Sequence, residues 1–305
     1  MRILVTGGAG FIASHVVDAY LAEGHEVAVV DNLSRGKKEN LNPGEDFHEV
    51  DLCEARELRA AFRRVRPELV NHHAAHTDLR GAVEDPVFDL RQNVLGTVNL
   101  LELCREFSVG RVIFISSGGA LYGEPQYLPV KEDHPISPLS PYGLSKYVGE
   151  RYLELYHRLY GLDYSILRYP NIYGPRQDPK GEAGVVAIFA DRIRRGRRPE
   201  VFGDGRKSRD YLYVGDVVRA NLLAAGEAGR CGVFNLGWGK EISDQEVFEA
   251  VRDALGSDVE PVYGEKRPGE IDRICLDASR AASELGWRPE VPFREGVRRT
   301  VAGGE

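Results

Sequence analysis

A glycine-rich segment close to the start of the chain most constrains its fold. Residues 6–13 read TGGAGFIA, follow a short apolar run and open a helix-length stretch. Gly7 would permit a tight turn, and Gly10 would let a pyrophosphate approach the amino end of the helix, where N–H groups favour an anion. Asp31 ends the next apolar run, where a carboxylate binds ribose hydroxyls and disfavours a 2′-phosphate. This order predicts an NAD site, with a turn or helix cap as the alternative role of Asp31.

Short apolar runs alternate with amphipathic stretches through the first half of the chain. The runs predict strands at residues 3–6, 27–31, 69–72 and 112–116, and the stretches predict helices at residues 11–23, 55–65 and 93–107. Strands that alternate with helices form right-handed βαβ units and a parallel sheet that is covered on both faces. The expected fold class is therefore α/β, with a Rossmann-type doubly wound parallel sheet.

The second half of the chain is punctuated by glycine and proline and carries shorter elements. We expect it to supply a smaller α/β substrate-binding domain over the carboxyl ends of the strands. The expected boundaries are 1–168 for the NAD-binding domain and 169–305 for the remainder, with returns of the chain to the first domain near 209–237 and 267–276.

A further helix is expected directly after Ser140. Serine is a good N-cap, Pro141 suits the first helical position, and Gly161 would end the pattern. The helix would carry Tyr142 and Lys146 on one face, because residues four apart are neighbours there. Lys146 and an oxidised nicotinamide would both lower the pKa of Tyr142, which makes this phenol a plausible general base toward a sugar or alcohol hydroxyl.

Composition limits the partners that the chain can take. The 305 residues carry a formal net charge of −7, and their four cysteines form no C-x-x-C pair. The acidic balance disfavours nucleic acid, so the basic run at 192–198 is expected to be a solvated helix end. No apolar run approaches the roughly 20 residues of a membrane span, and no signal peptide is expected. The cysteine spacing suits a reducing cytoplasm and argues against zinc.

Three histidines follow the third predicted strand, at positions 72, 73 and 76. Such a group can indicate a metal, but no carboxylate or cysteine of suitable spacing accompanies it. We therefore expect no metal, and we expect these side chains to line the cofactor or substrate cavity.

With the glycine-rich turn and the Tyr–Lys pair in place, the sequence resembles the extended short-chain dehydrogenase/reductase superfamily. Within its NAD-dependent epimerase/dehydratase family, it looks most like the UDP-glucose 4-epimerases. The similarity runs along nearly the whole chain, through segments that include VTGGAGFI (5–12), SSGGALYGE (116–124), SPYGLSK (140–146), RYPNIYGPRQDP (168–179), RDYLYVGDV (209–217) and RPGE (267–270).

The resemblance implies a set of residues around NAD. Asp31 and Asn32 would hold the adenosine ribose, and Asp51 and Leu52 would border the adenine. The full set implied for the cofactor is Gly7, Gly10, Phe11, Ile12, Asp31, Asn32, Ser34, Gly36, Asp51, Leu52, His73, Ala74, Ala75, Asn93, Ser116, Tyr142, Lys146 and Tyr169.

The resemblance also implies residues around a nucleotide sugar, most simply a UDP-hexose. They are Ser117, Gly118, Tyr142, Asn171, Val186, Phe202, Arg209, Arg267 and Glu270. The family usually has a catalytic Ser or Thr four residues before the tyrosine of its Y-G pair, yet this chain has Gly118 there. We expect the adjacent Ser117 to supply the hydroxyl, so that Ser117, Tyr142 and Lys146 form the catalytic group.

The implied activity is that of an isomerase. It would interconvert UDP-glucose and UDP-galactose through transient oxidation of C4 to a 4-ketosugar and return of hydride to the opposite face. The alternatives are an epimerase of UDP-N-acetylhexosamine or UDP-uronate, a 4,6-dehydratase or decarboxylase, and a noncatalytic NAD-binding regulator. Residues 119–121 lack the acid that dehydratases place before Y-G. A homodimer is expected, with helices 93–107 and 142–160 pairing across a four-helix interface.

Overall fold

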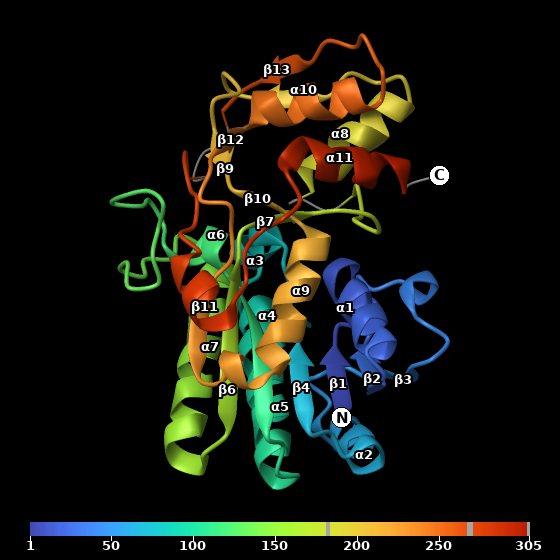
Figure 1. Ribbon diagram of the computed structural model, residues 1–305, viewed down its shortest axis with the longest axis vertical. Helices are drawn as coiled ribbons and strands as arrows, with labels where there is room; N and C mark the ends of the chain where they lie inside the picture. The colour runs from blue at the N-terminus through green and yellow to red at the C-terminus, as the bar shows by residue number, and fades with distance from the viewer. Residues whose placement is uncertain (181–183, 267–270, 304–305) are drawn as a thin grey trace.

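A seven-stranded parallel sheet forms the centre of the computed structural model, which describes residues 1–180, 184–266 and 271–303 (Figure 1). The strands lie in the order β11-β6-β5-β4-β1-β2-β3, and every neighbouring pair is parallel. Their bounds are β1 Arg2–Thr6, β2 Glu26–Asp31, β3 Asp46–Glu49, β4 Leu69–His72, β5 Arg111–Ser117, β6 Asp163–Tyr169 and β11 Gly232–Asn235. The order reverses between β1 and β4, and ligands of such sheets bind at the carboxyl ends beside that point.

Helices cover both faces of the sheet because successive residues of each strand point to opposite sides. On one face, Ile3 and Val5 pack with α1 (Phe11–Ala22) and α9 (Val214–Ala225). On the other face, Leu4 packs with α2 (Ala55–Val65), α5 (Gly96–Glu106) and α7 (Pro141–Tyr160). The doubly wound α/β fold expected from the sequence is confirmed.

Short helices carry the chain between the larger elements of this lobe. Before α5 come α3 (Leu79–Glu84), α4 (Pro86–Leu90) and a π-helical turn, η2 (Arg91–Leu95), so the helix predicted from residue 93 begins as a π turn. The other short helices are η1 (Lys38–Asn40), α6 (Gly118–Leu121), η3 (Glu227–Gly229) and a second π turn, η4 (Ala281–Leu285).

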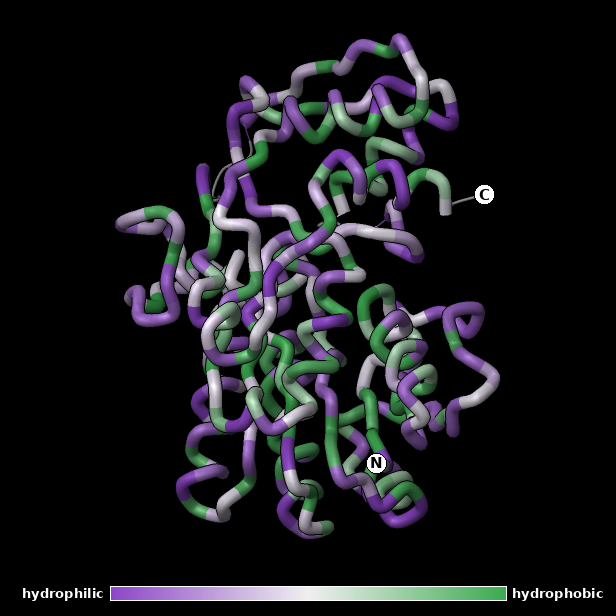
Figure 2. The backbone as a smooth tube through the Cα atoms, viewed as in Figure 1, coloured by the Kyte–Doolittle hydropathy of each residue, from purple (hydrophilic) through white to green (hydrophobic). Residues whose placement is uncertain are grey.

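A second lobe stands over the carboxyl ends of the strands, at the top of Figure 1. Its elements are β7 (Asn171–Tyr173), α8 (Val185–Arg194), β8 (Glu200–Phe202), β9 (Ser208–Arg209), β10 (Tyr211–Tyr213), β12 (Ile242–Ser243), α10 (Asp244–Ala254), β13 (Val262–Gly264) and α11 (Phe293–Ala302). Phe189, Phe248 and Val297 lie in its own apolar core. In Figure 2 the apolar stretches of both lobes run mainly through elements in the interior.

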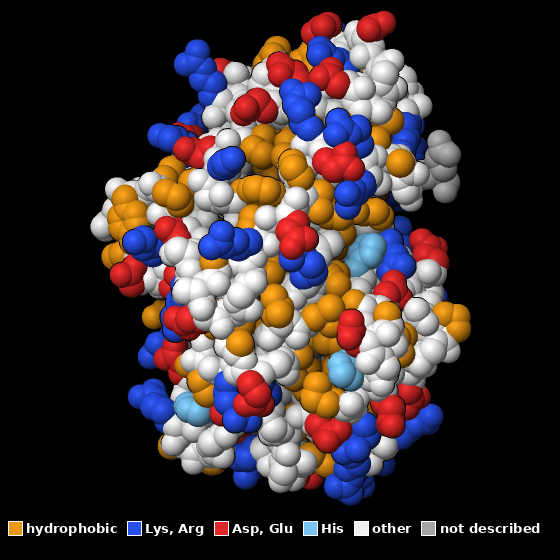
Figure 3. Space-filling view, viewed as in Figure 1, with side chains coloured by type: hydrophobic (Ala, Val, Ile, Leu, Met, Phe, Trp, Pro, Cys, Tyr) orange, Lys and Arg blue, Asp and Glu red, His pale blue; other side chains and the backbone are white. Residues whose placement is uncertain are grey.

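Charge is dispersed over the face that Figure 3 shows, where Lys and Arg side chains alternate with Asp and Glu. Arg195 pairs with Asp191, and Arg198 donates to backbone oxygens of Glu260 and Pro261, so the basic run at the end of α8 makes local contacts. Among the described residues, no helix has the length and apolar character needed to cross a bilayer.

Candidate active site

The glycine-rich turn joins β1 to α1 at the carboxyl edge of the sheet. Gly7 has a φ of +71°, and a Cβ placed on it would lie 2.8 Å from the backbone nitrogen of Ala74. The turn and the segment after β4 therefore touch backbone to backbone, which requires glycine. No side chain caps the amino end of α1 at Gly10. The uncapped N–H groups suit pyrophosphate oxygens, so this turn fits NAD.

Asp31 ends β2 beside this turn and is almost wholly buried. Its Oδ2 accepts a hydrogen bond from Ala9 N at 3.1 Å, and its Oδ1 accepts one from Leu33 N at 2.8 Å. Burial raises the pKa of Asp31, while these two bonds lower it. A Cβ on Gly36 would lie 2.8 Å from both carboxylate oxygens. The Asp31 carboxylate thus fixes the backbone around it. Its remaining lone pairs can accept hydrogen bonds from the hydroxyls of a ribose.

Residues expected around the adenosine lie together after β2 and β3. Asn32 Nδ2 donates to Asp51 Oδ2 at 2.9 Å, and Ser34 N donates to Asn32 Oδ1 at 3.0 Å. Asp51 Oδ1 accepts from Cys53 N at 2.8 Å, and Leu52 is buried beside it. This network fixes the loop geometry on which a ribose and a base could rest.

His73 leads the segment that faces the glycine-rich turn. Its backbone N–H donates to Thr6 O at 3.2 Å, and its Nε2 lies 3.5 Å from the hydroxyl of Tyr169. Burial and the charge of Lys146 lower the pKa of His73 to about 3, so the ring is neutral. Its buried Nδ1 has no hydrogen-bond partner. A buried nitrogen without a partner can form a hydrogen bond with a polar group of a ligand.

The other two histidines are held separately. His72 bridges Thr6 and Thr97, with Nδ1 2.7 Å from one hydroxyl and Nε2 2.9 Å from the other. His76 Nδ1 lies 3.6 Å from Asp89 Oδ1. These contacts place the histidines in the polar framework under the site.

Asn93 uses its amide to fix the segment after β4. Its Nδ2 donates to His76 O and to Asp89 Oδ1, both at 2.9 Å, and its Oδ1 accepts from His76 N at 2.7 Å. Both amide protons are therefore engaged within the protein. The contact with NAD that the resemblance implies for Asn93 could therefore use only an acceptor lone pair.

Tyr142 and Lys146 lie on the first two turns of α7, at the carboxyl end of β5. The helix has the bounds predicted from its caps: Ser140 Oγ accepts from Gly143 N at 3.1 Å, and Gly161 ends it with a φ of +71°. Tyr142 is half-buried and shares a hydrogen bond with Ser117. The structure therefore brings the expected hydroxyl to the expected phenol.

Burial dominates the titration of this pair. It raises the pKa of Tyr142 to about 12, against the lowering effect of the Ser117 hydrogen bond. It lowers the pKa of Lys146 to about 8, while the carboxylates of Asp89 and Glu150 raise it. Lys146 Nζ donates to the carbonyl of Ile115 at 2.9 Å. Lys146 is not among the groups that shift the pKa of Tyr142, and the charge of Asp89 raises that pKa further, so the expected lowering by Lys146 is not found. A positive charge beside Tyr142, such as an oxidised nicotinamide, would favour the phenolate.

Gly118 occupies the position where the family carries a hydroxyl. A Cβ on Gly118 would lie 2.3 Å from Cδ1 of Leu276, which is fully buried in a small apolar cluster with Tyr122, Val130 and Ile274. A side chain at position 118 would therefore force the side chain of Leu276 to shift. At Gly119 the nearest atoms to such a Cβ are Asn171 Oδ1 at 3.8 Å and Ser117 Oγ at 4.0 Å, so these two polar groups flank the open glycine.

The residues implied for substrate binding differ in their burial and in their contacts. Arg209 donates to the carbonyls of Ser208 at 2.8 Å and Ile271 at 2.7 Å, so its guanidinium is anchored at the junction of the lobes. Phe202 is half-buried at the end of β8. The side chain of Val186 is 1% exposed within the core of the second lobe, so a contact between Val186 and a substrate would have to come from its backbone. Arg267 and Glu270 lie outside the described residues.

Sequence reasoning missed the charged groups beneath the catalytic pair. Glu150 accepts from Ser116 Oγ at 2.6 Å and pairs with Arg168 at 2.6 Å, and both charges are buried. Asp89, also buried, accepts a short hydrogen bond of 2.5 Å from Ser145. Glu150 stands one turn after Lys146 on the same face of α7, a spacing that could have revealed it. Asp89 carries no such signal, because the chain brings it to α7 only through tertiary contact.

Comparisons with known proteins agree with this architecture. Residues 3–237 match the family described as "NAD dependent epimerase/dehydratase family". A UDP-glucose 4-epimerase of Mycolicibacterium smegmatis is 45% identical over 306 residues, which cover 99% of this chain and 97% of that protein.

Two solved structures are also similar over nearly the whole of both chains. The UDP-glucose 4-epimerase of Thermotoga maritima with UDP-glucose is 48% identical, with a TM-score of 0.97 and coverage of 99% of this chain and 98% of that one. The UDP-glucose 4-epimerase of Thermus thermophilus in complex with NAD is 47% identical, with a TM-score of 0.95 and the same coverage. This chain therefore belongs to the NAD-dependent epimerase/dehydratase family.

Proposed function

We propose that the protein is an NAD-dependent UDP-glucose 4-epimerase, an isomerase that interconverts UDP-glucose and UDP-galactose. The proposal is carried by the meeting of Tyr142, Lys146 and Ser117 on the sheet edge that also holds the glycine-rich turn and Asp31. Relatives that bear this name along their full length support the same activity.

The protein's own residues would divide the work as follows. Bound NAD⁺ supplies a reversible hydride acceptor for C4 of the hexose, which passes through a 4-ketosugar. Tyr142 would take the proton of the 4-hydroxyl and later return it. Ser117 would orient the phenol through their hydrogen bond. Lys146 would contribute a positive charge, which Asp89 and Glu150 help to maintain.

The nucleotide sugar would lie between the two lobes. Asn171 would offer its amide beside Ser117, and Arg209 with Arg267 would hold the diphosphate, because guanidinium groups form strong hydrogen bonds with phosphate oxygens. Phe202 would offer an aromatic face to the uracil, and Glu270 would add an acceptor. A dehydratase is disfavoured, because Gly119, Ala120 and Leu121 place no carboxylate beside the site.

The protein would act as a homodimer. Helix α7 exposes Leu144, Leu155 and Leu159 on one face, because their spacings of 11 and 4 residues are close to whole turns. Neighbouring α4 exposes Val87 and Leu90. Large apolar groups on adjacent helices are typical of an interaction surface, and a second copy would bury them.

Two further assignments accompany this function. The NAD-binding domain would comprise residues 1–168 with returns near 209–237 and 267–276. In support, β11 and α9 pack with the first lobe, and Leu276 lies under Gly118. The four cysteines are free thiols, which supports a cytoplasmic location.

Product analysis tests the proposed function. The purified protein would be incubated with UDP-, dTDP-, GDP- and CDP-hexoses, and the products identified by NMR. We expect UDP-glucose and UDP-galactose to interconvert, and Tyr142→Phe to slow turnover by about 10²–10⁴-fold. Tyr160→Phe is the matched control, because Tyr160 is exposed at the far end of the same helix. A 4-keto-6-deoxysugar product, or wild-type turnover by Tyr142→Phe, would contradict the proposal.

A further inference from the structure

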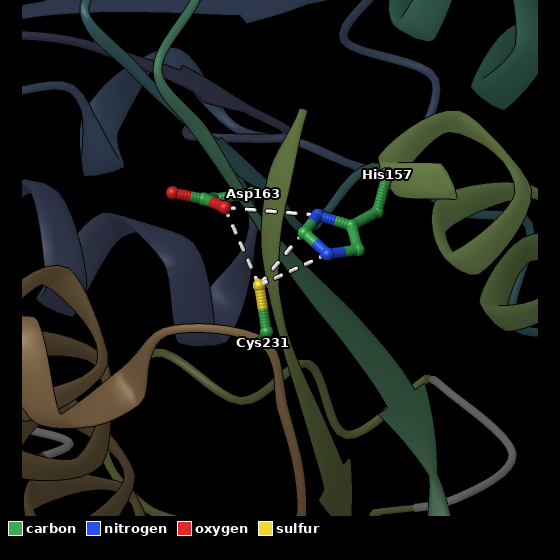
Figure 4. Close-up of side chains that lie close together, drawn as sticks. All are labelled: His157, Asp163 and Cys231. Atoms are coloured by element: carbon green, nitrogen blue, oxygen red, sulfur yellow. Dashed lines mark hydrogen bonds and ion pairs between the residues drawn. The ribbon is translucent and has the colours of Figure 1, made fainter. Parts of the chain in front are cut away.

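Three potential metal ligands, His157, Asp163 and Cys231, lie close together (Figure 4). They stand at the amino ends of β6 and β11, whereas Tyr142 and Ser117 stand at the carboxyl end of the sheet. His157 comes from the last turn of α7, Asp163 begins β6, and Cys231 directly precedes β11. Cys231 Sγ lies 3.7 Å from His157 Nδ1 and 3.3 Å from Asp163 Oδ1, and the nitrogen and oxygen lie 3.7 Å apart.

These distances match the edges of a zinc coordination tetrahedron. Bond lengths of about 2.0–2.3 Å to nitrogen, oxygen and sulfur place tetrahedral ligand atoms about 3.3–3.6 Å apart. The three edges differ from these values by only tenths of an ångström. Sγ also lies 3.8 Å from Nε2, almost as close as it lies to Nδ1, so the imidazole would have to turn to direct Nδ1 at a shared ion. Thiolate, imidazole and carboxylate are also the donor types that zinc takes in proteins.

The surroundings orient the three side chains. Arg230 Nε holds the second oxygen of Asp163 at 2.8 Å, which leaves Oδ1 directed at the cluster. Such a hydrogen bond to a ligating carboxylate is the usual support for a metal site. The carboxyl end of α7 adds a negative dipole that favours a cation. His157 Nδ1 also lies 3.2 Å from Leu162 O, so metal binding would replace that hydrogen bond.

We propose that His157, Asp163 and Cys231 bind a zinc ion, with water as the fourth ligand. The side chains of His157 and Asp163 are 38% and 20% exposed, so the fourth position is accessible to solvent. The sequence alone predicted no metal, because it has no C-x-x-C pair, and Cys231 stands 68 residues after Asp163.

The zinc ion would tie three elements together. β11 is an edge strand whose single neighbour in the sheet is β6. Cys231 stands 68 residues after Asp163, so a bridge between them would close a long loop and restrict the unfolded chain. We expect zinc to stabilise this edge of the fold and to have no part in the chemistry at Tyr142.

Metal analysis of the tag-free holoprotein provides the test. The protein would be incubated with zinc, dialysed, and its metal measured by atomic emission. Wild type should retain one zinc per chain, whereas Cys231→Ser and His157→Gln should each retain almost none. Cobalt in place of zinc should give a thiolate-to-cobalt charge-transfer band in wild type, and this band should vanish in Cys231→Ser. Zinc should raise the Tm of wild type but not that of Cys231→Ser or His157→Gln.

Cys53→Ser is the matched control, because Cys53 is the other partly exposed thiol. It should bind zinc and cobalt like wild type. Circular dichroism of each metal-free variant separates loss of binding from loss of folding, and His157→Gln provides a second test if Cys231→Ser folds poorly. Equal zinc retention by wild type and both ligand variants, or no zinc in wild type, would overturn the proposal.

Discussion

Ser117 is the side chain of the protein that lowers the pKa of Tyr142. Its hydrogen bond favours the ionised phenol, whereas burial opposes ionisation. We expect Ser117→Ala to lower kcat by roughly 10–100-fold, because a hydrogen bond to a charged group contributes about 1.5–3 kcal/mol. KM should change little.

Ser117→Thr is the control for this prediction, because it keeps the hydroxyl. It should recover most of the lost turnover in a steady-state epimerisation assay. Wild-type turnover by Ser117→Ala would show that the hydroxyl at position 117 has no part in the reaction.

Position 118 tests whether packing excludes a side chain there. Gly118→Ala should lower the free energy of unfolding by about 1–3 kcal/mol, because its new methyl group would overlap Leu276. Gly119→Ala should be nearly neutral, because the nearest atom to its Cβ lies 3.8 Å away. Urea denaturation measures both changes.

A double-mutant cycle identifies the cause. Leu276→Val removes the overlapping methyl group, so Gly118→Ala should cost less stability in that background. Additive losses would mean that Leu276 is not the obstacle.

Among the single residues of the site, the sequence predicted those that stand in a local motif. Gly7, Asp31, Tyr142 and Lys146 stand in motifs whose spacing reflects their positions on one turn, strand or helix. Asp89 could not be predicted, because only the folding of α4 against α7 brings it to Ser145. The pKa of Tyr142 likewise depends on burial, which no motif reports.

Among the elements, α7 combines catalysis with the proposed dimer contact. Its inner face carries Lys146, and its outer face exposes Leu144, Leu155 and Leu159. We expect Leu155→Glu to convert a dimer to a monomer in light scattering, because a charge buried at an apolar interface lacks a partner.

Leu223→Glu on α9 is the matched control, because Leu223 is 37% exposed and Leu155 is 38% exposed. This variant should remain dimeric. A monomeric wild type, or dissociation by both variants, would contradict the assignment of the interface to α7.

The helices and strands differ in how clearly the sequence predicts them. The bounds of α7 follow from Ser140, Pro141 and Gly161, and all four predicted strands are present. The strands β3, β6 and β11 were not predicted as strands. β3 reads DFHE and has a single apolar residue, and β11 reads GVFN and begins with glycine, so neither stands out as a buried strand. Their pairing depends on the neighbouring strands that receive them.

Across the whole molecule, Asp210 joins segments that are distant in the sequence. Its carboxylate accepts from Trp238 N and Gly239 N, both at 3.0 Å, and from Leu276 N at 3.2 Å. Burial raises the pKa of Asp210 to about 6. The folded protein therefore binds more protons than the unfolded chain between the ordinary carboxyl pKa and about 6, so this group favours folding increasingly as pH falls through that range.

Asp210→Asn should remove this contribution. We expect the variant's free energy of unfolding to rise less than that of wild type between pH 7 and pH 5, by at most about 1.4 kcal/mol per pH unit. Urea titrations at both pH values measure the difference. Equal pH slopes in the two proteins would show that Asp210 titrates normally.

The sequence predicted the first lobe better than the second. The alternation of strands and helices encodes the doubly wound sheet directly. In the second lobe, strands of two or three residues pair with distant partners, as β12 does with β9 and β13 with β8. Such short pieces carry too little periodicity to be recognised before the packing of Phe189 against Phe248 is known.

Both borders of the central sheet are closed to further strand addition. On one side β3 is short and places Asp46 and Glu49 in ion pairs with Arg64 and Lys38. On the other, the backbone N–H of Asn235 in β11 already donates to Glu132 Oε1 at 2.8 Å. Short, charged or covered borders prevent sheets of neighbouring molecules from joining edge to edge. We therefore expect that concentrated protein does not form cross-β aggregates by joining at these borders.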